Sequence, residues 1–138
     1  FTSSSKYMDL LQDNPKLGHI TTFGGHPVIA AAALATLKEI TGSNLMSQTL
    51  EKEALIRQHL KHPLITEIRG RGLMLAAITQ SADITNEVVL KCKDEGLILF
   101  WLLFEPKAIR ISPPLTISND DIIKGCMIIT RVLDCISL

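Results

Sequence analysis

The sequence predicts an α+β domain, in which a small, largely antiparallel sheet carries helices on one face. Three observations predict this class. Stretches with helical periodicity flank short apolar stretches typical of strands, the strand-like stretches come in consecutive pairs, and a glycine-containing connection joins the first pair. A chain of 138 residues with 46% hydrophobic residues is long enough and apolar enough to bury a core of this kind.

Helical patterns dominate the first sixty residues. We expect a short helix over residues 4–13, ended by Asn14-Pro15, and a second helix from Val28 to Ile40, closed by Thr41-Gly42. A third helix is predicted from about Asn44 to Leu60. Its spacing places Met46, Leu50 and Ala54 on the apolar face and points Glu51, Lys52 and Arg57 outward.

The middle of the chain changes to strand-like periods. Leu64–Arg69 and Leu73–Thr79 are predicted strands, joined by Gly70-Arg71-Gly72 in a hairpin-like connection. An RGG-like segment of this kind also occurs in RNA-binding chains, but a single copy between two strands favours the hairpin. A helix marked by Ile84, Val88 and Cys92 follows, and Gly96 ends it.

Two more strands and a helix complete the prediction. The dense apolar stretch Leu97–Phe104 is expected to be a strand buried on both faces. Lys107–Ser112 is a further short strand, preceded by the turn Glu105-Pro106-Lys107 and stopped by Pro113-Pro114. Ser118 and Asp121 form a capping-box pattern for the last helix. Its apolar positions are Ile122, Cys126, Ile129, Leu133 and Ile136.

Composition excludes several classes of partner. The 14 basic and 14 acidic side chains balance, so no basic stripe predicts nucleic-acid binding. The apolar stretches are too short to span a bilayer, which predicts no membrane partner. Cys92, Cys126 and Cys135 have no paired spacing, and Cys92 and Cys126 fall on apolar helix faces. We therefore expect buried free thiols and a cytoplasmic protein. Because the chain opens with Phe1 and a polar run, we also expect a fragment of a longer protein.

The first candidate site is the junction at residues 21–27. Gly24-Gly25 predicts a turn, and Pro27 suits the first position of the helix that follows. Such a junction presents unpaired backbone N–H groups and the positive end of a helix dipole, which together favour phosphate. Thr21 and Thr22 can add hydroxyl donors. The alternative is an ordinary turn without a ligand.

The second candidate is Arg110. It lies between Ile109 and Ile111 on a short strand, so its side chain is expected on the opposite face, beside the rigid Pro113-Pro114. A guanidinium held in this way suits bidentate capture of a carboxylate. The alternatives are an exposed sheet arginine and a partner in an internal ion pair. His59 and His62 share a helix face, but no further ligand completes a set, so no metal site is predicted.

Four segments, taken in order, resemble one enzyme family. Residues 19–27, His-Ile-Thr-Thr-Phe-Gly-Gly-His-Pro, resemble the H-x-x-T-[FY]-G-G-N-P segment of class III, pyridoxal-phosphate-dependent aminotransferases. Arg69–Met74 resembles R-G-x-G-L-[ML], Gly96–Ile98 resembles G-[LV]-[IL], and Arg110–Leu115 resembles R-x-x-P-P-L. The resemblance covers nearly the whole chain. It implies residues 1–35 as the end of the large cofactor-binding domain and 36–138 as the C-terminal small domain of a fold-type-I enzyme.

The resemblance also implies a cofactor, partners and site residues. The parent protein is expected to be a homodimer that uses pyridoxal 5'-phosphate (PLP) to move an amino group between an amino donor and a 2-oxo acid. Thr22, through its hydroxyl, and Phe23, through the adjacent backbone, are implied contacts to the phosphate of the partner subunit's PLP. Arg110 is the implied grip on the substrate carboxylate.

Two departures from the family pattern bear on these expectations. His26 replaces the commoner Asn before Pro27. The family's Schiff-base lysine belongs upstream of the Gly-Gly loop, and no lysine here occupies an equivalent place, so the segment alone is expected to be inactive. Two alternatives remain: a non-enzymatic interaction module derived from an aminotransferase, and an unrelated α+β ligand-binding domain.

Overall fold

The computed structural model describes residues 3–11 and 20–136 of the chain. By their contacts these residues divide into two units, one up to Gly42 and one from Ser43 onward. The predicted boundary at residue 35 concerns the domains of a larger protein and stays a prediction. None of the helices in the described part of the chain is long and apolar enough to cross a membrane.

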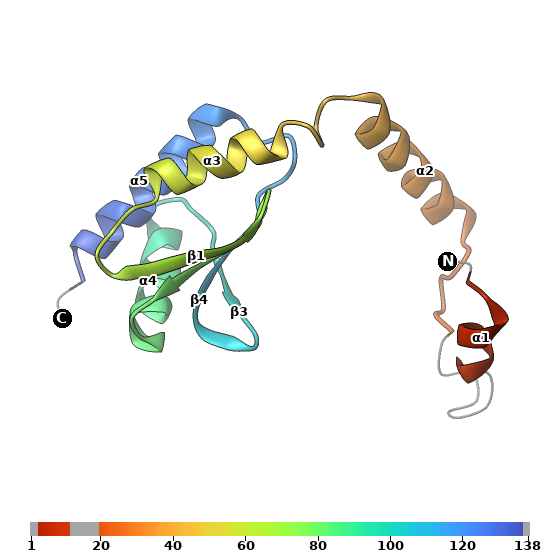
Figure 1. Ribbon diagram of the computed structural model, residues 1–138, viewed down its shortest axis with the longest axis horizontal. Helices are drawn as coiled ribbons and strands as arrows, with labels where there is room; N and C mark the ends of the chain where they lie inside the picture. Colours follow the sequence, from red (N-terminus) through yellow and green to blue (C-terminus); the bar gives the residue numbers. More distant parts are fainter. Residues whose placement is uncertain (1–2, 12–19, 137–138) are drawn as a thin grey trace. The chain divides into compact units, whose positions relative to one another are not determined.

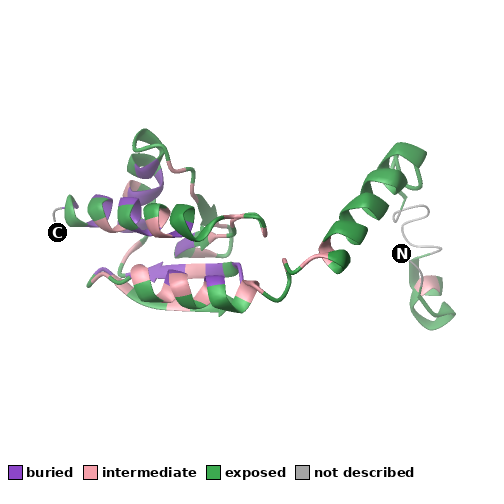
Figure 2. Cartoon of the chain, turned by 90° about the horizontal axis from the view of Figure 1, so that it is seen from above, coloured by how far each residue is buried: buried purple, intermediate pink, exposed green. Residues whose placement is uncertain are grey.

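The first unit is helical. It contains α1 (Ser5–Met8), a 3₁₀ turn (Asp9–Leu11) and α2 (Pro27–Gly42). The first two replace the single helix expected over residues 4–13, of which residues 12 and 13 lie outside the described part. The helix expected from Val28 is confirmed as α2, which begins one residue earlier, at Pro27. No residue of α2 is buried within this unit, as Figure 2 shows by its exposed colouring.

The second unit is an antiparallel sheet covered by three helices (Figure 1). Its elements are α3 (Thr49–His59), β1 (Ile65–Arg71), β2 (Met74–Thr79), α4 (Ala82–Asp94), β3 (Phe100–Leu102), β4 (Glu105–Ile111) and α5 (Asn119–Asp134). The strand order is β1-β2-β4-β3, and every neighbouring pair is antiparallel. The predicted fold class is confirmed.

One hydrophobic core joins the three helices to the sheet. Leu75, Ala77 and Ile109 are alternate residues of β2 and β4, so they share one face, and all three are buried. Four of the five apolar positions predicted for this helix, from Ile122 to Leu133, are buried within α5, and the fifth, Ile136, is buried just after α5 ends. Ser118 caps α5 by accepting a hydrogen bond from the Asp121 N–H, at 3.1 Å. Both the cap and the buried face of this helix are therefore confirmed.

Helix α3 departs from its prediction in its start and in its buried face. Residues 44–48 form turns in which Ser47 Oγ donates to the Asn44 carbonyl and Thr49 Oγ1 to the Met46 carbonyl. These local bonds compete with helix formation, so α3 begins only at Thr49. Its buried positions face the core through Ile56, Leu60 and Lys52. The predicted apolar face was wrong: Met46, Leu50 and Ala54 are exposed.

Lys52 was expected to point outward and is instead only 6% exposed. Its ammonium Nζ donates a hydrogen bond to the Leu115 carbonyl at 2.7 Å. The aliphatic stem of a lysine tolerates burial when the charged end finds a partner in this way. This hydrogen bond across sixty-three residues of sequence accompanies the burial of Ile56 and Leu60 in the core.

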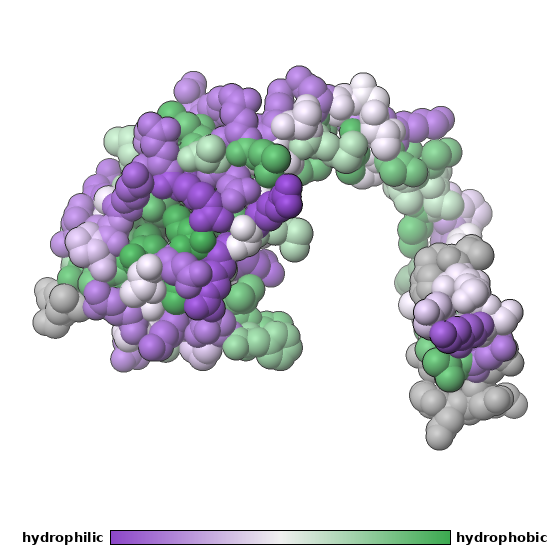
Figure 3. All heavy atoms as spheres, viewed as in Figure 1, coloured by the Kyte–Doolittle hydropathy of each residue, from purple (hydrophilic) through white to green (hydrophobic). Residues whose placement is uncertain are grey.

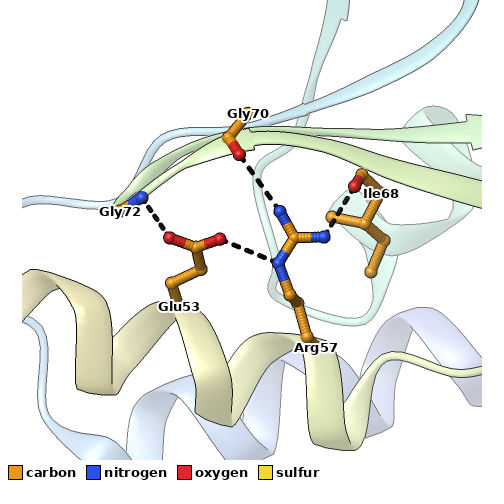
Figure 4. Close-up of polar contacts among 5 residues, drawn as sticks. All are labelled: Glu53, Arg57, Ile68, Gly70 and Gly72. Carbon is orange, nitrogen blue, oxygen red and sulfur yellow. Dashed lines mark hydrogen bonds and ion pairs between the residues drawn. The ribbon is translucent and has the colours of Figure 1, made fainter.

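A polar network ties α3 to the β1–β2 hairpin (Figure 4). Arg57 donates from Nη1 to the Ile68 carbonyl at 2.6 Å and from Nη2 to the Gly70 carbonyl at 3.1 Å. Glu53 accepts from Arg57 Nε at 2.8 Å and from the Gly72 N–H at 2.5 Å. The Gly72 N–H, followed by Arg57, lowers the pKa of the Glu53 carboxyl. Because Arg57 bonds to carbonyls of the edge strand β1, it protects that edge from pairing with another chain.

The stretch Leu97–Phe104 differs most from its prediction. Only Phe100–Leu102 forms a strand, β3, and it lies at the open edge of the sheet. The expectation of burial on both faces was wrong, since Ile98 is 78% exposed and Phe104 is 97% exposed. In Figure 3 apolar atoms project at the β3–β4 hairpin.

The turn before β4 also shifts. Leu102 pairs with Glu105, so the turn lies at Leu103–Phe104 rather than at Glu105-Pro106-Lys107. Pairing of β4 with β2 starts only at Ala108. Pro106 has no N–H, and it lies before the part of β4 that pairs with β2, so no hydrogen bond to β2 is lost at this position.

Cys92 and Cys126 are free and buried, as predicted, whereas Cys135 is free and exposed. Burial raises the pKa of both buried thiols from 9.0 to about 11. For Cys92 the neighbouring Glu95 adds to this effect. The two thiols therefore stay protonated at neutral pH and are poor nucleophiles.

We expect a disulfide-exchange reagent at pH 8 to modify Cys135 rapidly and the two buried thiols only when the chain is unfolded in denaturant. A folded-state pKa above the unfolded value of 9.0 means that the unfolded chain loses these protons first. The free energy of unfolding should consequently fall as pH rises from about 9 to about 11. A Cys92→Ser, Cys126→Ser double variant should lose that pH dependence. Rapid modification of three thiols in the native chain would contradict the prediction.

Candidate functional site

The Gly-Gly loop forms a tight turn directly before α2. The Gly24 N–H donates to the Thr21 carbonyl at 3.2 Å, and the His26 N–H donates to the Phe23 carbonyl at 3.1 Å. A side chain at Gly24 would place its Cβ only 2.7 Å from Thr21 Oγ1. Gly25 adopts a φ of +76°, which favours glycine. The backbone of this turn therefore favours glycine at position 25, and a side chain at position 24 would require the Thr21 side chain to move.

His26 caps the start of α2. Its carbonyl accepts from the Ala30 N–H at 3.0 Å, and its ring Nδ1 accepts from the Val28 N–H at 3.3 Å. Pro27 has no N–H. The expectation of free donors at the helix start therefore needs a correction, because the histidine itself occupies the Val28 N–H. An N-cap Asn makes the same kind of bond, which explains why His is accommodated before Pro27.

Donors suited to phosphate remain at the predicted positions. Thr22 and Phe23 are exposed, and Phe23 contacts the His26 ring edge-on at 6.3 Å between centroids. Among residues 3–11 and 20–136, no acceptor takes the Thr22 hydroxyl or the Phe23 N–H. A hydroxyl and a backbone N–H on one tight turn are the donor types that bind a phosphate group. The loop therefore fits the phosphate end of PLP in its donor chemistry.

Arg110 is the penultimate residue of β4. Ile109 is fully buried and Arg110 is exposed, so the two side chains point to opposite faces, as predicted. Across the sheet Arg110 pairs in register with Ala76 of β2 and Phe100 of β3. Its guanidinium carbon Cζ lies 5.1 Å from the centroid of the Phe100 ring, which is a cation–π contact. No acidic side chain in the described part of the chain forms an ion pair with it.

Two cavities meet at Arg110. One of about 240 Å³ lies between β3, the residues after β4 and helix α5, with Leu97, Ile117 and Ile129 among its lining residues. The other, of about 290 Å³, lies on the sheet face that the helices leave open, next to Arg69 and Ala76. Arg110 therefore borders both cavities, and its side chain lies on the sheet face of the second one.

His62 has a structural role. Its Nδ1 accepts from the Leu64 N–H at 3.1 Å, and its Nε2 lies 3.2 Å from Asp134 Oδ1 at the end of α5. These two contacts assign the ring proton to Nε2. The described residues contain no cluster of three or more His, Cys, Asp or Glu side chains arranged to hold a metal ion.

Comparison with known proteins settles the family. A family model described as "Aminotransferase class-III" matches residues 2–133, which is nearly the whole chain. The chain belongs to the class III aminotransferases. Class III aminotransferases are PLP-dependent in general, and the match includes both the T-F-G-G loop and the R-x-x-P-P-L segment of this chain.

Individual relatives agree with this assignment. The chain is 32% identical over 120 residues to an acetylornithine aminotransferase of Caldanaerobacter subterraneus. This alignment covers 83% of the chain and 30% of the relative. It is 35% identical over 117 residues to a putrescine aminotransferase of Pectobacterium atrosepticum, covering 80% and 25%. The chain therefore spans about a third or less of the length of the curated relatives that it matches.

Solved structures share the fold. An ornithine aminotransferase from Toxoplasma gondii superposes with a TM-score of 0.70 at 31% identity, covering 91% of this chain and 30% of that chain. A Bacillus anthracis aminotransferase gives 0.75 at 28% identity, covering 88% and 31%. Both solved structures are aminotransferases, and this chain corresponds to about a third of each.

The contact of Phe100 with Arg110 is the feature of the site that sequence reasoning missed. Phe100 was assigned to a buried core strand, and the turn was placed two residues too late. The register between the two strands depends on that turn. Once Leu102 is paired with Glu105, Phe100 becomes the cross-strand partner of Arg110.

Proposed function

We propose that the protein containing this chain is a PLP-dependent aminotransferase that transfers an amino group between an amino donor and a 2-oxo acid. The family match over residues 2–133 carries this proposal. PLP, when bound, accepts and returns the amino group through its aldehyde carbon. We further propose that the protein is a homodimer and that it is located in the cytoplasm. The free cysteines suit the cytoplasm, because its reducing conditions keep thiols unpaired.

In this proposal the Gly-Gly loop binds the phosphate of the partner subunit's PLP. Thr22 donates its hydroxyl, and Phe23 donates its backbone N–H. Both donors lie on the turn that Gly24 and Gly25 shape, and no protein acceptor in the described residues takes them. Because the phosphate carries two negative charges near neutral pH, each of these bonds is charge-assisted.

Arg110 binds the carboxylate of the substrate. It has the fork geometry that a carboxylate needs, and no ion pair within the described residues occupies it. By its contact with the Phe100 ring, the guanidinium is oriented before a substrate arrives. The relatives are named as aminotransferases of three different donors, acetylornithine, putrescine and 4-aminobutyrate. The amino donor of this protein must therefore be identified by an activity assay.

The direct test uses the full-length protein that contains this chain, supplied with PLP. We expect it to form the amino acid corresponding to an added 2-oxo acid when an amino donor is present, and to form none when PLP is removed. Trials with acetylornithine, 4-aminobutyrate and putrescine cover the donors after which the relatives are named. If the protein transfers no amino group from any donor, with or without PLP, that result would favour the non-enzymatic interaction module instead.

We expect Thr22→Ala to weaken PLP binding in the full-length protein. Loss of one hydrogen bond to a charged phosphate costs about 1–2 kcal/mol, or roughly a 5- to 30-fold rise in Kd. Equilibrium dialysis of PLP measures this change. Thr36→Ala is the matched control, because the Thr36 hydroxyl donates to the Ala32 carbonyl within α2. An unchanged Kd for Thr22→Ala, or an equal loss for Thr36→Ala, would argue against the phosphate contact.

A further inference from the structure

The two open edges of the sheet differ in how they are protected. At the β1 edge, Arg57 donates hydrogen bonds to the carbonyls of Ile68 and Gly70. At the other edge, β3 has β4 as its only strand partner among the described residues, and residues 97–104 contain no charge. Proteins usually protect such an edge with charges, proline or a covering segment, because its unpaired backbone groups bind other strands. The β3 edge is therefore open to pairing.

Large apolar side chains are exposed along β3, just before it and in the turn after it. We refer to five of them as the hairpin patch: Ile98, Phe100, Trp101, Leu103 and Phe104. An aromatic side chain buries roughly 150–250 Å² and an aliphatic one somewhat less, so the exposed fractions amount to roughly 600 Å². The largest apolar patch of a typical monomer covers about 300–600 Å², and patches at or above this size mark contact surfaces.

The turn of this hairpin gives a second, independent reason to expect a contact. Leu102 pairs with Glu105, so Leu103 and Phe104 form a two-residue loop. Loops of this length favour Asn, Asp and Gly, because they require positive φ angles. Leu103 is 91% exposed and Phe104 is 97% exposed, so neither side chain gains burial within the chain in return. A local sequence that opposes its own turn is typical of a functional surface.

A second copy of this chain fits the hairpin patch in symmetry and in area. An edge strand that pairs antiparallel with its own copy generates a twofold axis, the commonest symmetry of protein dimers. With Trp101, the middle residue of β3, at this axis, the turn of each copy reaches the segment before β3 of the other, where Ile98 is exposed. Burial of roughly 600 Å² on each copy gives roughly 1,200 Å² in total, the lower limit of specific interfaces.

The charges around the hairpin patch agree with this partner. Glu95 and Glu105 directly border the apolar stretch, and both disfavour an anionic lipid surface. In the twofold arrangement the two copies of Glu105 lie at opposite ends of the contact, because the two β3 strands run in opposite directions. Arg110 lies on β4, one strand inside the edge. Like charges therefore do not meet across the paired strands.

We propose that the chain associates with a second copy through the hairpin patch, with β3 of one copy paired antiparallel to β3 of the other. The two sheets then continue into each other, and the apolar side chains exclude water from the new pair of strands. This contact goes beyond the proposed enzyme function and does not depend on PLP, Thr22 or Arg110. In a protein that is already a homodimer across the PLP site, it joins dimers into a larger assembly.

Sedimentation equilibrium of the 138-residue chain tests the contact. A double variant, Leu103→Asn with Phe104→Gly, removes the two most exposed side chains of the patch and installs the pair that two-residue loops prefer. We expect the unmodified chain to dimerise at roughly 100 μM, and the double variant to dimerise at least roughly tenfold more weakly. A monomeric unmodified chain at that concentration, or equal association of the two proteins, overturns the proposal.

Helix α2 provides the matched control, because it exposes two leucines of its own. Leu34→Gln with Leu37→Gln removes these side chains and keeps good helix formers. We expect this control to dimerise as the unmodified chain does. A loss in the control that equals or exceeds the loss in the hairpin variant overturns the proposal, since α2 would then carry the contact. Circular dichroism verifies that both variants are folded.

Two further measurements identify the mode of contact. Amide hydrogen exchange at residues 98–102 should slow as the chain concentration rises, because pairing protects the backbone of β3. Dimers without this protection overturn the strand pairing. Flotation with vesicles of phosphatidylcholine and phosphatidylglycerol tests the lipid alternative. A monomeric chain that floats with vesicles, and loses this binding in the hairpin variant, assigns the patch to a lipid surface instead.

The full-length protein distinguishes failure of this inference from failure of the proposed function. We expect the hairpin variant to form a smaller assembly than the unmodified protein and to keep its amino transfer, because neither turn residue belongs to the proposed site. Equal assembly masses with amino transfer intact overturn the inference and leave the aminotransferase proposal standing. Different masses with no amino transfer in either protein overturn the proposed function and support the contact.

Discussion

Gly70→Ala is expected to destabilise the chain more than a methyl group added at any other glycine that the structure describes. Gly70 lies within β1 at a φ of +109°, and a Cβ there would lie 2.1 Å from the Met74 carbonyl oxygen across the hairpin. A residue forced into such a conformation costs about 1–3 kcal/mol, and the collision with the backbone adds to this cost. We therefore expect the free energy of unfolding to fall by about 3 kcal/mol or more.

Urea unfolding of the chain measures this change through the transition midpoint. Two glycines of the same unit give a graded comparison. Gly72, at a φ of +59°, has only the Thr49 side chain at 3.4 Å from its added Cβ, so Gly72→Ala should cost about 1–2 kcal/mol. Gly125 lies inside α5 with its nearest neighbour at 3.9 Å, and Gly125→Ala should stabilise by up to about 1 kcal/mol. Similar stabilities for all three variants would contradict the described hairpin.

The loss at Gly70 should extend to the α3 contacts as well. The Gly70 carbonyl accepts from Arg57, and Glu53 accepts from the Gly72 N–H two residues later. Any movement of the β1 backbone that relieves the collision therefore shifts acceptors and donors that hold α3. The R-G-R-G segment therefore both shapes the hairpin and supplies the backbone groups that bond to α3.

Local patterns predicted the parts of the fold that depend on neighbouring residues. The spacing of Ile122, Cys126 and Ile129 predicted the buried face of α5. The glycines at 70 and 72 predicted the first hairpin, but its turn lies at Gly72-Leu73 rather than at Gly70-Arg71-Gly72, because β1 extends to Arg71. Each of these signals lies within one element, where periodicity and turn chemistry act directly.

Contacts between distant residues were beyond such patterns. The predicted apolar face of α3 is exposed, and the face that is buried contains Lys52, whose ammonium donates a hydrogen bond to the distant Leu115 carbonyl. The turn at Leu103–Phe104 contains none of the residues that usually mark a hairpin turn, so the second hairpin was placed wrongly. Because that error moved Phe100 out of register, the sequence pointed to Arg110 as a site residue but not to the ring that holds it.

Arg110→Lys is expected to have the largest effect on activity in the full-length aminotransferase. Lysine keeps the positive charge but cannot form a bidentate hydrogen bond to a carboxylate. It also lacks the planar guanidinium that contacts the Phe100 ring. Loss of a hydrogen bond to a carboxylate costs about 1.5–3 kcal/mol, so kcat/KM for a donor with a carboxylate should fall roughly 10- to 150-fold. Putrescine, a diamine without a carboxylate, should lose little.

Steady-state rates at varied donor concentration measure this difference, because in ping-pong kinetics kcat/KM for the donor reports the donor half of the cycle alone. Arg69→Lys is the matched control: Arg69 is an exposed arginine of the same sheet, already paired with Glu67 at 2.8 Å. An equal fall for 4-aminobutyrate and putrescine in Arg110→Lys would identify the arginine as structural. A fall confined to carboxylate donors, with the control unchanged, would identify the guanidinium on β4 as the group that recognises the substrate, since charge alone is retained in the lysine variant.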